Sequence, residues 1–104
     1  FGDMIVFCTK WEGAEQALNM AGKDHFSGKI VIDTTNPLKF AAPNQPPVPG
    51  VVYPRSCASI IQGWLPKAHG VKCFNIVPAP HMVNPSFTEG KPDMFIAGNH
   101  PDAK

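Results

Sequence analysis

Polar side chains and backbone donors follow three short apolar runs of the sequence, at the points where these runs end. Thr9-Lys10-Trp11 follows the first run, Thr34-Thr35-Asn36-Pro37 the second, and Asn75-Ile76-Val77-Pro78 ends the third. In parallel sheets a ligand lies at the carboxyl ends of the strands, so these hydroxyl, amide and N–H groups could hold and orient a polar molecule. The alternative is that Thr and Asn only begin loops and form turns, as they commonly do.

Two tryptophans offer flat aromatic surfaces. Lys10-Trp11 could stack against a cofactor ring with a cation–π contribution. The alternative, packing at the start of a helix, is the commoner role of a Trp in that position. Trp64 falls on the apolar face of a predicted helix and is expected in the core.

Metal chemistry is not predicted. The histidines form no HxH or HExxH pattern and stand far from any cysteine pair, at His25, His69, His81 and His100. Each is expected at the surface, although His81 lies in the loop after the third apolar run and could face a substrate.

The cysteines are expected to be free thiols. Cys8, Cys57 and Cys73 are an odd number without CxxC spacing, which favours a reducing compartment and a cytoplasmic protein. Cys8 stands near a predicted strand end and could act as a nucleophile. A buried structural thiol is the favoured interpretation.

Composition limits the classes of function further. The 104 residues allow one small domain, and 43% apolar against 16% charged residues is typical of a globular chain. With a net charge of +1 and no run of basic residues, no nucleic-acid partner is predicted. No apolar stretch approaches the roughly 18 residues that span a bilayer, so no membrane association is expected either.

Strands and helices are predicted to alternate in the first third of the chain. The unbroken apolar run of residues 4–8 is typical of a strand covered on both faces. Helical spacing of alanine and leucine follows over residues 12–21, with Gly22 placed to end the helix. A second strand over residues 29–33 completes a β-α-β unit.

The remainder continues this alternation after a long loop. Residues 37–54 are too rich in proline for a helix or a central strand. A helix is predicted from an N-cap at Ser56 to Pro66, followed by strands over residues 71–77 and 93–98. The result is an open, mostly parallel α/β sheet in which strands near residues 4–8, 29–33 and 71–76 are adjacent and in sequence order.

The glycine fingerprint of dinucleotide-binding sheets is missing. No two glycines have the GxGxxG spacing, and no glycine loop follows the first strand. We therefore expect residues 1–104 to be a single partial domain, the second half of a doubly wound Rossmann-type sheet whose first β-α-β unit is absent. The chain enters a strand pattern almost at Phe1, which supports this interpretation.

Four blocks of sequence resemble a known family. The blocks DMIVFCTKWEGAEQAL, GKIVIDTTNPL, VKCFNIVPAPHMVNPSF and PDMFIAGNHPDAK resemble, in this order, the NADP oxidoreductases that are coenzyme F420-dependent, among them the NADPH-dependent deazaflavin reductases. The resemblance extends from Gly2 to Lys104. It implies a Rossmann-type NAD(P)-binding fold.

The resemblance also implies roles for the residues at the strand ends. Those beside the nicotinamide end of the cofactor are Thr9, Lys10, Trp11, Asn36, Pro37 and Asn75. Those facing the second substrate are Ile76, Val77, Pro78 and Ala79, with His81 in the loop beyond them. Lys10 stands where the family usually has Pro, and Ile76 where it usually has Thr.

The implied function is that of an NAD(P)H-dependent oxidoreductase. Hydride would pass between NADP(H), with NAD not excluded, and a small redox substrate such as coenzyme F420 (a deazaflavin) or flavin. Such a transfer needs stacked, oriented rings and no strong acid or base from the protein. The alternative is a non-catalytic Rossmann-like interaction module that docks on a partner chain, and a homo-oligomer is left open. The 104-residue chain by itself is expected to be inactive and to bind dinucleotide weakly.

Overall fold

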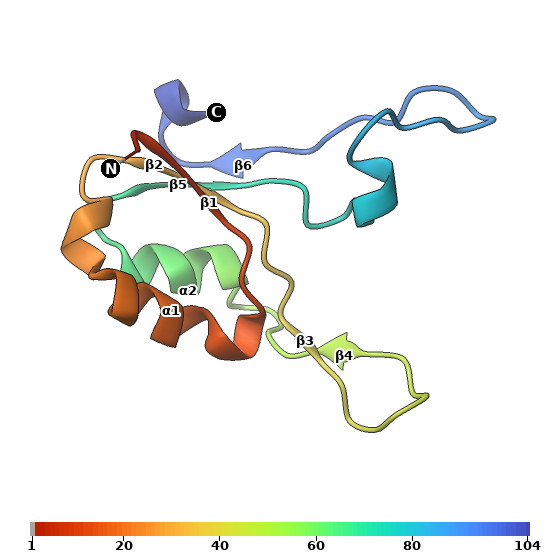
Figure 1. The fold of residues 1–104 in the computed structure, drawn as a ribbon, viewed down its shortest axis with the longest axis horizontal. Helices are drawn as coiled ribbons and strands as arrows, with labels where there is room; N and C mark the ends of the chain where they lie inside the picture. The colour runs from red at the N-terminus through yellow and green to blue at the C-terminus, as the bar shows by residue number, and fades with distance from the viewer. Residues whose placement is uncertain (1) are drawn as a thin grey trace.

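A computed structural model describes residues 2–104, and its main feature is a four-stranded sheet. The strands lie in the order β1 (Met4–Phe7), β2 (Ile30–Asp33), β5 (His69–Lys72) and β6 (Ala97–Gly98). β1, β2 and β5 are parallel, and β6 is antiparallel to β5 (Figure 1). The predicted parallel strands, adjacent and in sequence order, are confirmed.

Two strands differ from their predicted extents. β5 occupies residues 69–72 and not 71–77, because Phe74 adopts a left-handed backbone conformation with φ of 63° that turns the chain away from the sheet. β6 is limited to Ala97–Gly98. Phe95 just before it is 75% exposed, so the apolar run there has no buried surface to join.

The two helices are shorter than predicted: the helix expected over residues 12–21 begins at Ala14, and the helix expected to reach Pro66 ends at Trp64. The end of the first and the start of the second lie at the residues that capping rules indicate. α1 (Ala14–Ala21) follows a 3-10 turn at Trp11–Gly13 and ends at Gly22, whose φ of 80° is costly for any residue with a Cβ. α2 (Cys57–Trp64) begins at the N-cap Ser56. Its hydroxyl accepts from Ser59 N at 3.1 Å and the Ser59 hydroxyl accepts from Ser56 N at 3.1 Å, a reciprocal capping box.

Both α-helices lie on the same side of the sheet, where the core forms (Figure 1). The buried cluster combines strand, helix and loop residues: Phe7, Ala14, Leu18, Phe26, Val31, Ile61, Leu65 and Ala68. On the opposite face Met4 and Val6 are 57% and 58% exposed. The expectation that β1 is covered on both faces is therefore wrong within residues 2–104, because the chain described supplies helices to one face only.

The proline-rich segment contains a short hairpin. β3 (Leu38–Lys39) pairs antiparallel with β4 (Val48–Pro49), and this two-stranded sheet projects from the body of the molecule (Figure 1). The remaining elements are 3-10 turns at Lys23–Phe26, Ala79–His81 and Pro101–Ala103. Among the described residues, no helix has the length and apolar character needed to cross a membrane.

Candidate functional site

The ends of the three parallel strands are held together at one edge of the sheet. Phe7, Asp33 and Lys72 are the last residues of β1, β2 and β5, and they stand at one level of the strand register. Thr34 N donates to the carbonyl oxygen of Phe7 at 3.0 Å, and Cys73 N donates to that of Asp33 at 3.1 Å. The backbone pairing thus continues one residue beyond the strands and fixes where the loops begin.

The loop after β2 is shaped by Asp33. This residue is 3% exposed, and its Oδ1 accepts from Thr35 N at 2.8 Å and from the Thr35 hydroxyl at 2.7 Å. Aspartate commonly stabilises a turn through an N–H two residues ahead in this way. Thr35 is itself 2% exposed, so the turn forms inside the molecule and Asn36 is the first residue to emerge.

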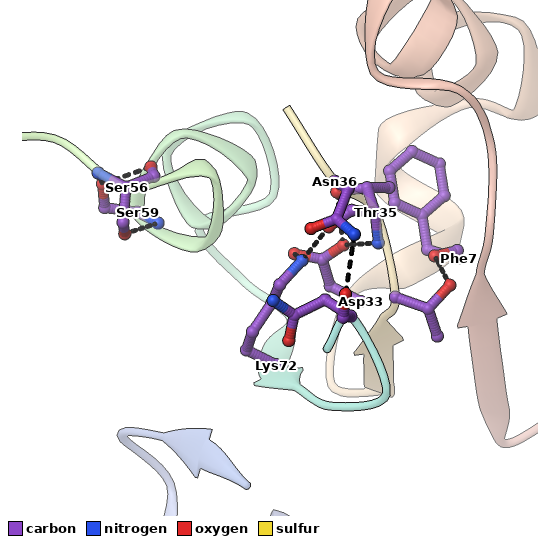
Figure 2. A network of polar contacts seen from close by, with 9 residues as sticks. Phe7, Asp33, Thr35, Asn36, Ser56, Ser59 and Lys72 are labelled. Carbon is purple, nitrogen blue, oxygen red and sulfur yellow. Dashed lines mark hydrogen bonds and ion pairs between the residues drawn. The ribbon is translucent and has the colours of Figure 1, made fainter. Parts of the chain in front are cut away.

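Lys72 completes this network from the neighbouring strand. Its Nζ lies 3.1 Å from Asp33 Oδ2 and also donates to the backbone carbonyl of Thr35 (Figure 2). The side chains of Lys72 and Asp33 are 12% and 4% exposed. Both oxygens of the Asp33 carboxylate are therefore satisfied, as a buried charge requires.

The loops after β2 and β5 meet through Asn36. Its side-chain amide donates to the backbone carbonyl of Asn75 at 2.6 Å (Figure 2). The left-handed Phe74 precedes that carbonyl, and Val77 N donates to Phe74 O at 3.1 Å to close the turn. Two residues that sequence reasoning assigned to the cofactor are thus in contact, but Asn75 contributes its backbone and not its amide side chain.

The residues after β1 lie in mixed surroundings. Lys10 is exposed, whereas the hydroxyl oxygen of Thr9 is buried and has no hydrogen-bond partner among the described residues. An unpaired buried hydroxyl is uncommon in proteins because its desolvation is not compensated. A polar ligand at this edge of the sheet would supply a partner.

Trp11 packs against the other tryptophan. The two indole rings are stacked with centroids 5.7 Å apart and an interplanar angle of 25°, and both contact the core from its border. One face of the Trp11 ring is therefore occupied by Trp64. Trp11 also borders an open hollow of about 650 Å³ between the helices and the hairpin, where Phe40 is 69% exposed.

The residues assigned to the second substrate lie along the chain beyond β5. Ile76 is 59% exposed, Pro78 and Ala79 are also exposed, and Val77 is half-buried. His81 ends the 3-10 turn Ala79–His81, and its ring lies 4.8 Å from that of Phe87. His81 thus packs against the neighbouring loop residue Phe87 and not against Asn36 or Asn75.

A cavity of about 340 Å³ borders the buried network on the side of α2 and β6. Asp33 and Lys72 form part of its wall, and Ser59, Gln62 and Asn99 add polar groups. Gln62 is held by its own contacts, since its Nε2 donates to the carbonyl oxygens of Leu65 and Ala68 at 2.9 and 3.0 Å.

The thiols and candidate metal ligands are dispersed. All three cysteines are free, Cys57 and Cys73 being buried. Cys8 is exposed, which contradicts the expectation of a buried structural thiol, because its side chain follows Phe7 and points away from the covered face of the sheet. No group of three His, Cys, Asp or Glu side chains that could hold a metal ion is found in residues 2–104.

Sequence reasoning missed Asp33 and Lys72. The sequence pattern indicates Asp33 only as the end of an apolar strand and Lys72 only as an interior residue of the next one. One signal was present, because Asp followed two residues later by Thr is a turn-forming pattern. The partnership with Lys72 required the strand register, which places the two residues side by side.

Comparison with known proteins finds one similar family and similar solved structures. Residues 1–37 match the family of NADP oxidoreductases, coenzyme F420-dependent. A crystal structure from Arthrobacter sp. FB24, described as a "putative f420 dependent nadp-reductase", is similar with a TM-score of 0.89 and 33% identity over 98% of this chain. This chain is similar to that family over residues 1–37 and to the Arthrobacter protein over nearly its whole length. Its fold is Rossmann-like, as its sequence predicted.

A second solved structure has a similar fold. A hypothetical protein from Sinorhizobium meliloti has a TM-score of 0.75 and 27% identity over 98% of this chain. This chain spans 46% of the Arthrobacter protein and 47% of the Sinorhizobium protein, about half the length of each. No match was found among proteins with curated descriptions.

Proposed function

We propose that the full-length protein is an NAD(P)H-dependent oxidoreductase that transfers hydride between NADP(H) and a second small redox substrate. The observation that carries the proposal is the contact between Asn36 and the Asn75 backbone, at 2.6 Å, which joins the loops after β2 and β5 at the carboxyl edge of the sheet. This is the edge at which Rossmann sheets bind dinucleotides. The family match over residues 1–37 covers β1, β2 and Asn36 itself.

The residues at this edge fit the nicotinamide end of such a cofactor. The buried Thr9 hydroxyl lacks a partner among residues 2–104, and Asn36 is exposed in the loop after the neighbouring strand β2. When bound, the nicotinamide supplies the hydride. Thr9, Asn36 and the backbone at Asn75 would hold and orient the ring.

The pyrophosphate of a dinucleotide does not fit these residues. Pyrophosphate is usually bound by backbone N–H groups of a glycine loop at a helix N-terminus. Residues 1–104 contain no GxGxxG. We therefore place that contact in residues outside this chain, consistent with relatives about twice as long.

The second substrate is proposed to be a flat redox ring, a deazaflavin or a flavin. The backbone from Asn75 to Ala79 follows the Asn36 contact and would line its side of the cleft. Lys10 and Pro37 would border the nicotinamide, and one face of Trp11 remains for stacking.

Full-length protein tests the proposal. NADPH and NADH are each offered with a panel of oxidised deazaflavin, flavin, quinone and metal-chelate acceptors, and loss of the reduced nicotinamide is followed. We expect oxidation of NADPH with at least one ring acceptor. Failure with every acceptor, together with absence of dinucleotide binding in calorimetry, would favour the non-catalytic interaction module.

A pair of variants tests the residues named. Asn36→Ala removes the amide that reaches the second loop, whereas Asn75→Ala leaves the accepting carbonyl in place. We expect Asn36→Ala to reduce kcat by about tenfold or more with a smaller change in KM for NADPH, since misoriented rings slow transfer more than they weaken binding. Equal effects of the two substitutions would show that the Asn36–Asn75 contact is not what matters.

A further inference from the structure

We propose that Asp33 and Lys72 are positioning residues. They hold the loops after β2 and β5, at the carboxyl edge of the sheet, in one arrangement without touching the cofactor themselves. The inference rests on the proposed function and adds residues to its site. It is carried by three observations: the burial of both charges, the way they hold Thr35, and the connection from Thr35 to Asn36.

The ion pair is largely enclosed, and Asp33 and Lys72 border the cavity of about 340 Å³ beside α2 and β6, away from the Asn36–Asn75 contact. Lys72 and Asp33 side chains are 12% and 4% exposed, and Thr35 is 2% exposed. Every hydrogen bond that the two side chains make goes to the end of β2 or to the turn that follows it. Its influence on a ligand at the Asn36–Asn75 contact therefore passes through the residues that it holds.

Thr35 is fixed on both sides of its backbone. Its N–H donates to Asp33 Oδ1 at 2.8 Å, and its carbonyl accepts from Lys72 Nζ. A residue whose N–H and C=O are both held has little freedom in φ and ψ, so the next residue leaves in a defined direction. That residue is Asn36, and its amide reaches Asn75 O at 2.6 Å.

The backbone of the same two residues also anchors the loop after β5. Lys72 ends β5, and Cys73 N donates to the carbonyl of Asp33 at 3.1 Å. Phe74 then takes its left-handed conformation, with φ of 63°, and presents the Asn75 carbonyl. A bulky residue in this region costs free energy and persists only where its surroundings hold it. The strained turn follows directly on the anchored residue.

Stability alone does not account for a charged pair in this position. Replacing a buried ion pair by apolar side chains of similar volume is often neutral or stabilising. The neighbouring position in the register is the apolar Phe7, 6% exposed, so the site accepts apolar side chains at this level of the sheet. Apolar side chains in place of Asp33 and Lys72 could not hydrogen-bond to the N–H and the carbonyl of Thr35.

Kinetics of the full-length protein test the proposal. Lys72→Met should lower kcat by about tenfold or more while KM for NADPH changes by less than about twofold, and Lys72→Arg should restore most of the rate. Lys67→Met is the matched control, because Lys67 is exposed and precedes β5. An unchanged kcat in Lys72→Met, or an equal fall in Lys67→Met, overturns the proposal.

A double variant covers the case in which Lys72→Met does not fold. Asp33→Asn combined with Lys72→Met removes both charges and leaves no buried carboxylate without a partner. It should fold and bind NADPH, and its kcat should still be low. Recovery of the kcat of the unsubstituted protein in the double variant would show that the pair serves stability alone.

Amide hydrogen exchange separates this inference from the proposed function. The amides of Thr35 and Cys73, which bond to Asp33 in the structure, should exchange faster in Lys72→Met and stay slow in Lys67→Met. This readout needs no redox acceptor. If no acceptor is found and exchange is still faster in Lys72→Met, the proposed activity fails and the positioning role of Asp33 and Lys72 stands. If exchange at both amides is unchanged in Lys72→Met, the positioning role is overturned whatever the activity.

Discussion

The two faces of the main sheet differ although they are built from the same strands. Val31 of β2 is 1% exposed on the face covered by α1 and α2, whereas Val6 of β1 is 58% exposed on the other face. Both valines come from apolar runs of similar appearance. An apolar run therefore indicates a strand suited to burial, but the covering layer must come from other elements. Residues 2–104 provide it on one side only.

The largest effect is expected where a helix side chain enters the covered face. Leu18 of α1 is 1% exposed, so Leu18→Ala should lower the free energy of unfolding by about 2–5 kcal/mol through lost burial and a residual cavity. Met20 on the same helix is 81% exposed, and Met20→Ala should change it by about 0.5 kcal/mol or less. Denaturant unfolding of both variants measures the difference. Similar losses would mean that α1 does not pack as described.

A pair of valines compares the two faces directly. Val31→Ala should cost about 2–3 kcal/mol, and Val6→Ala less than about 1 kcal/mol, because Val6 loses little buried surface. Thermal or denaturant unfolding of the 104-residue chain is the measurement.

The same two valine substitutions, made in the full-length protein, test whether further residues cover the second face of the sheet. If additional residues cover the second face, Val6→Ala should become about as costly as Val31→Ala. If the two costs stay apart in the full-length protein, that face remains open to solvent.

A smaller effect is expected at the start of α2, the other helix of the covered face. Ser56→Ala removes one half of the capping box and should destabilise the chain by about 1 kcal/mol. Ser27 is exposed and follows a 3-10 turn without making a side-chain cap, so Ser27→Ala serves as the control. Equal melting temperatures for the two variants would contradict the capping role.

The order of the strands could be predicted because it depends on local signals. Apolar runs, the stop at Gly22 and the N-cap at Ser56 each act within a few residues, and right-handed crossovers then leave few topologies. The end of β5 could not be predicted. It depends on the left-handed turn at Phe74, and no local preference of phenylalanine indicates such a conformation.

The candidate site was predicted less completely than the fold. Asn36 and Asn75 could be placed at one edge because Asn36 follows one predicted strand and Asn75 lies near the end of another, and they do meet. The Asp33–Lys72 pair could not be found, since 39 residues separate its members and only the register brings them together. The stacking of Trp11 on Trp64 depends likewise on how α1 and α2 pack.

The position of β1 at the end of the sheet affects how the 104-residue chain behaves in concentrated solution. Within residues 2–104, β1 pairs with β2 alone, so its outer row of N–H and C=O groups can template another strand. Met4 and Val6 lie exposed along the same strand and add an adhesive apolar surface. We therefore expect the isolated chain to self-associate as its concentration rises, with light scattering increasing before any unfolding is detected.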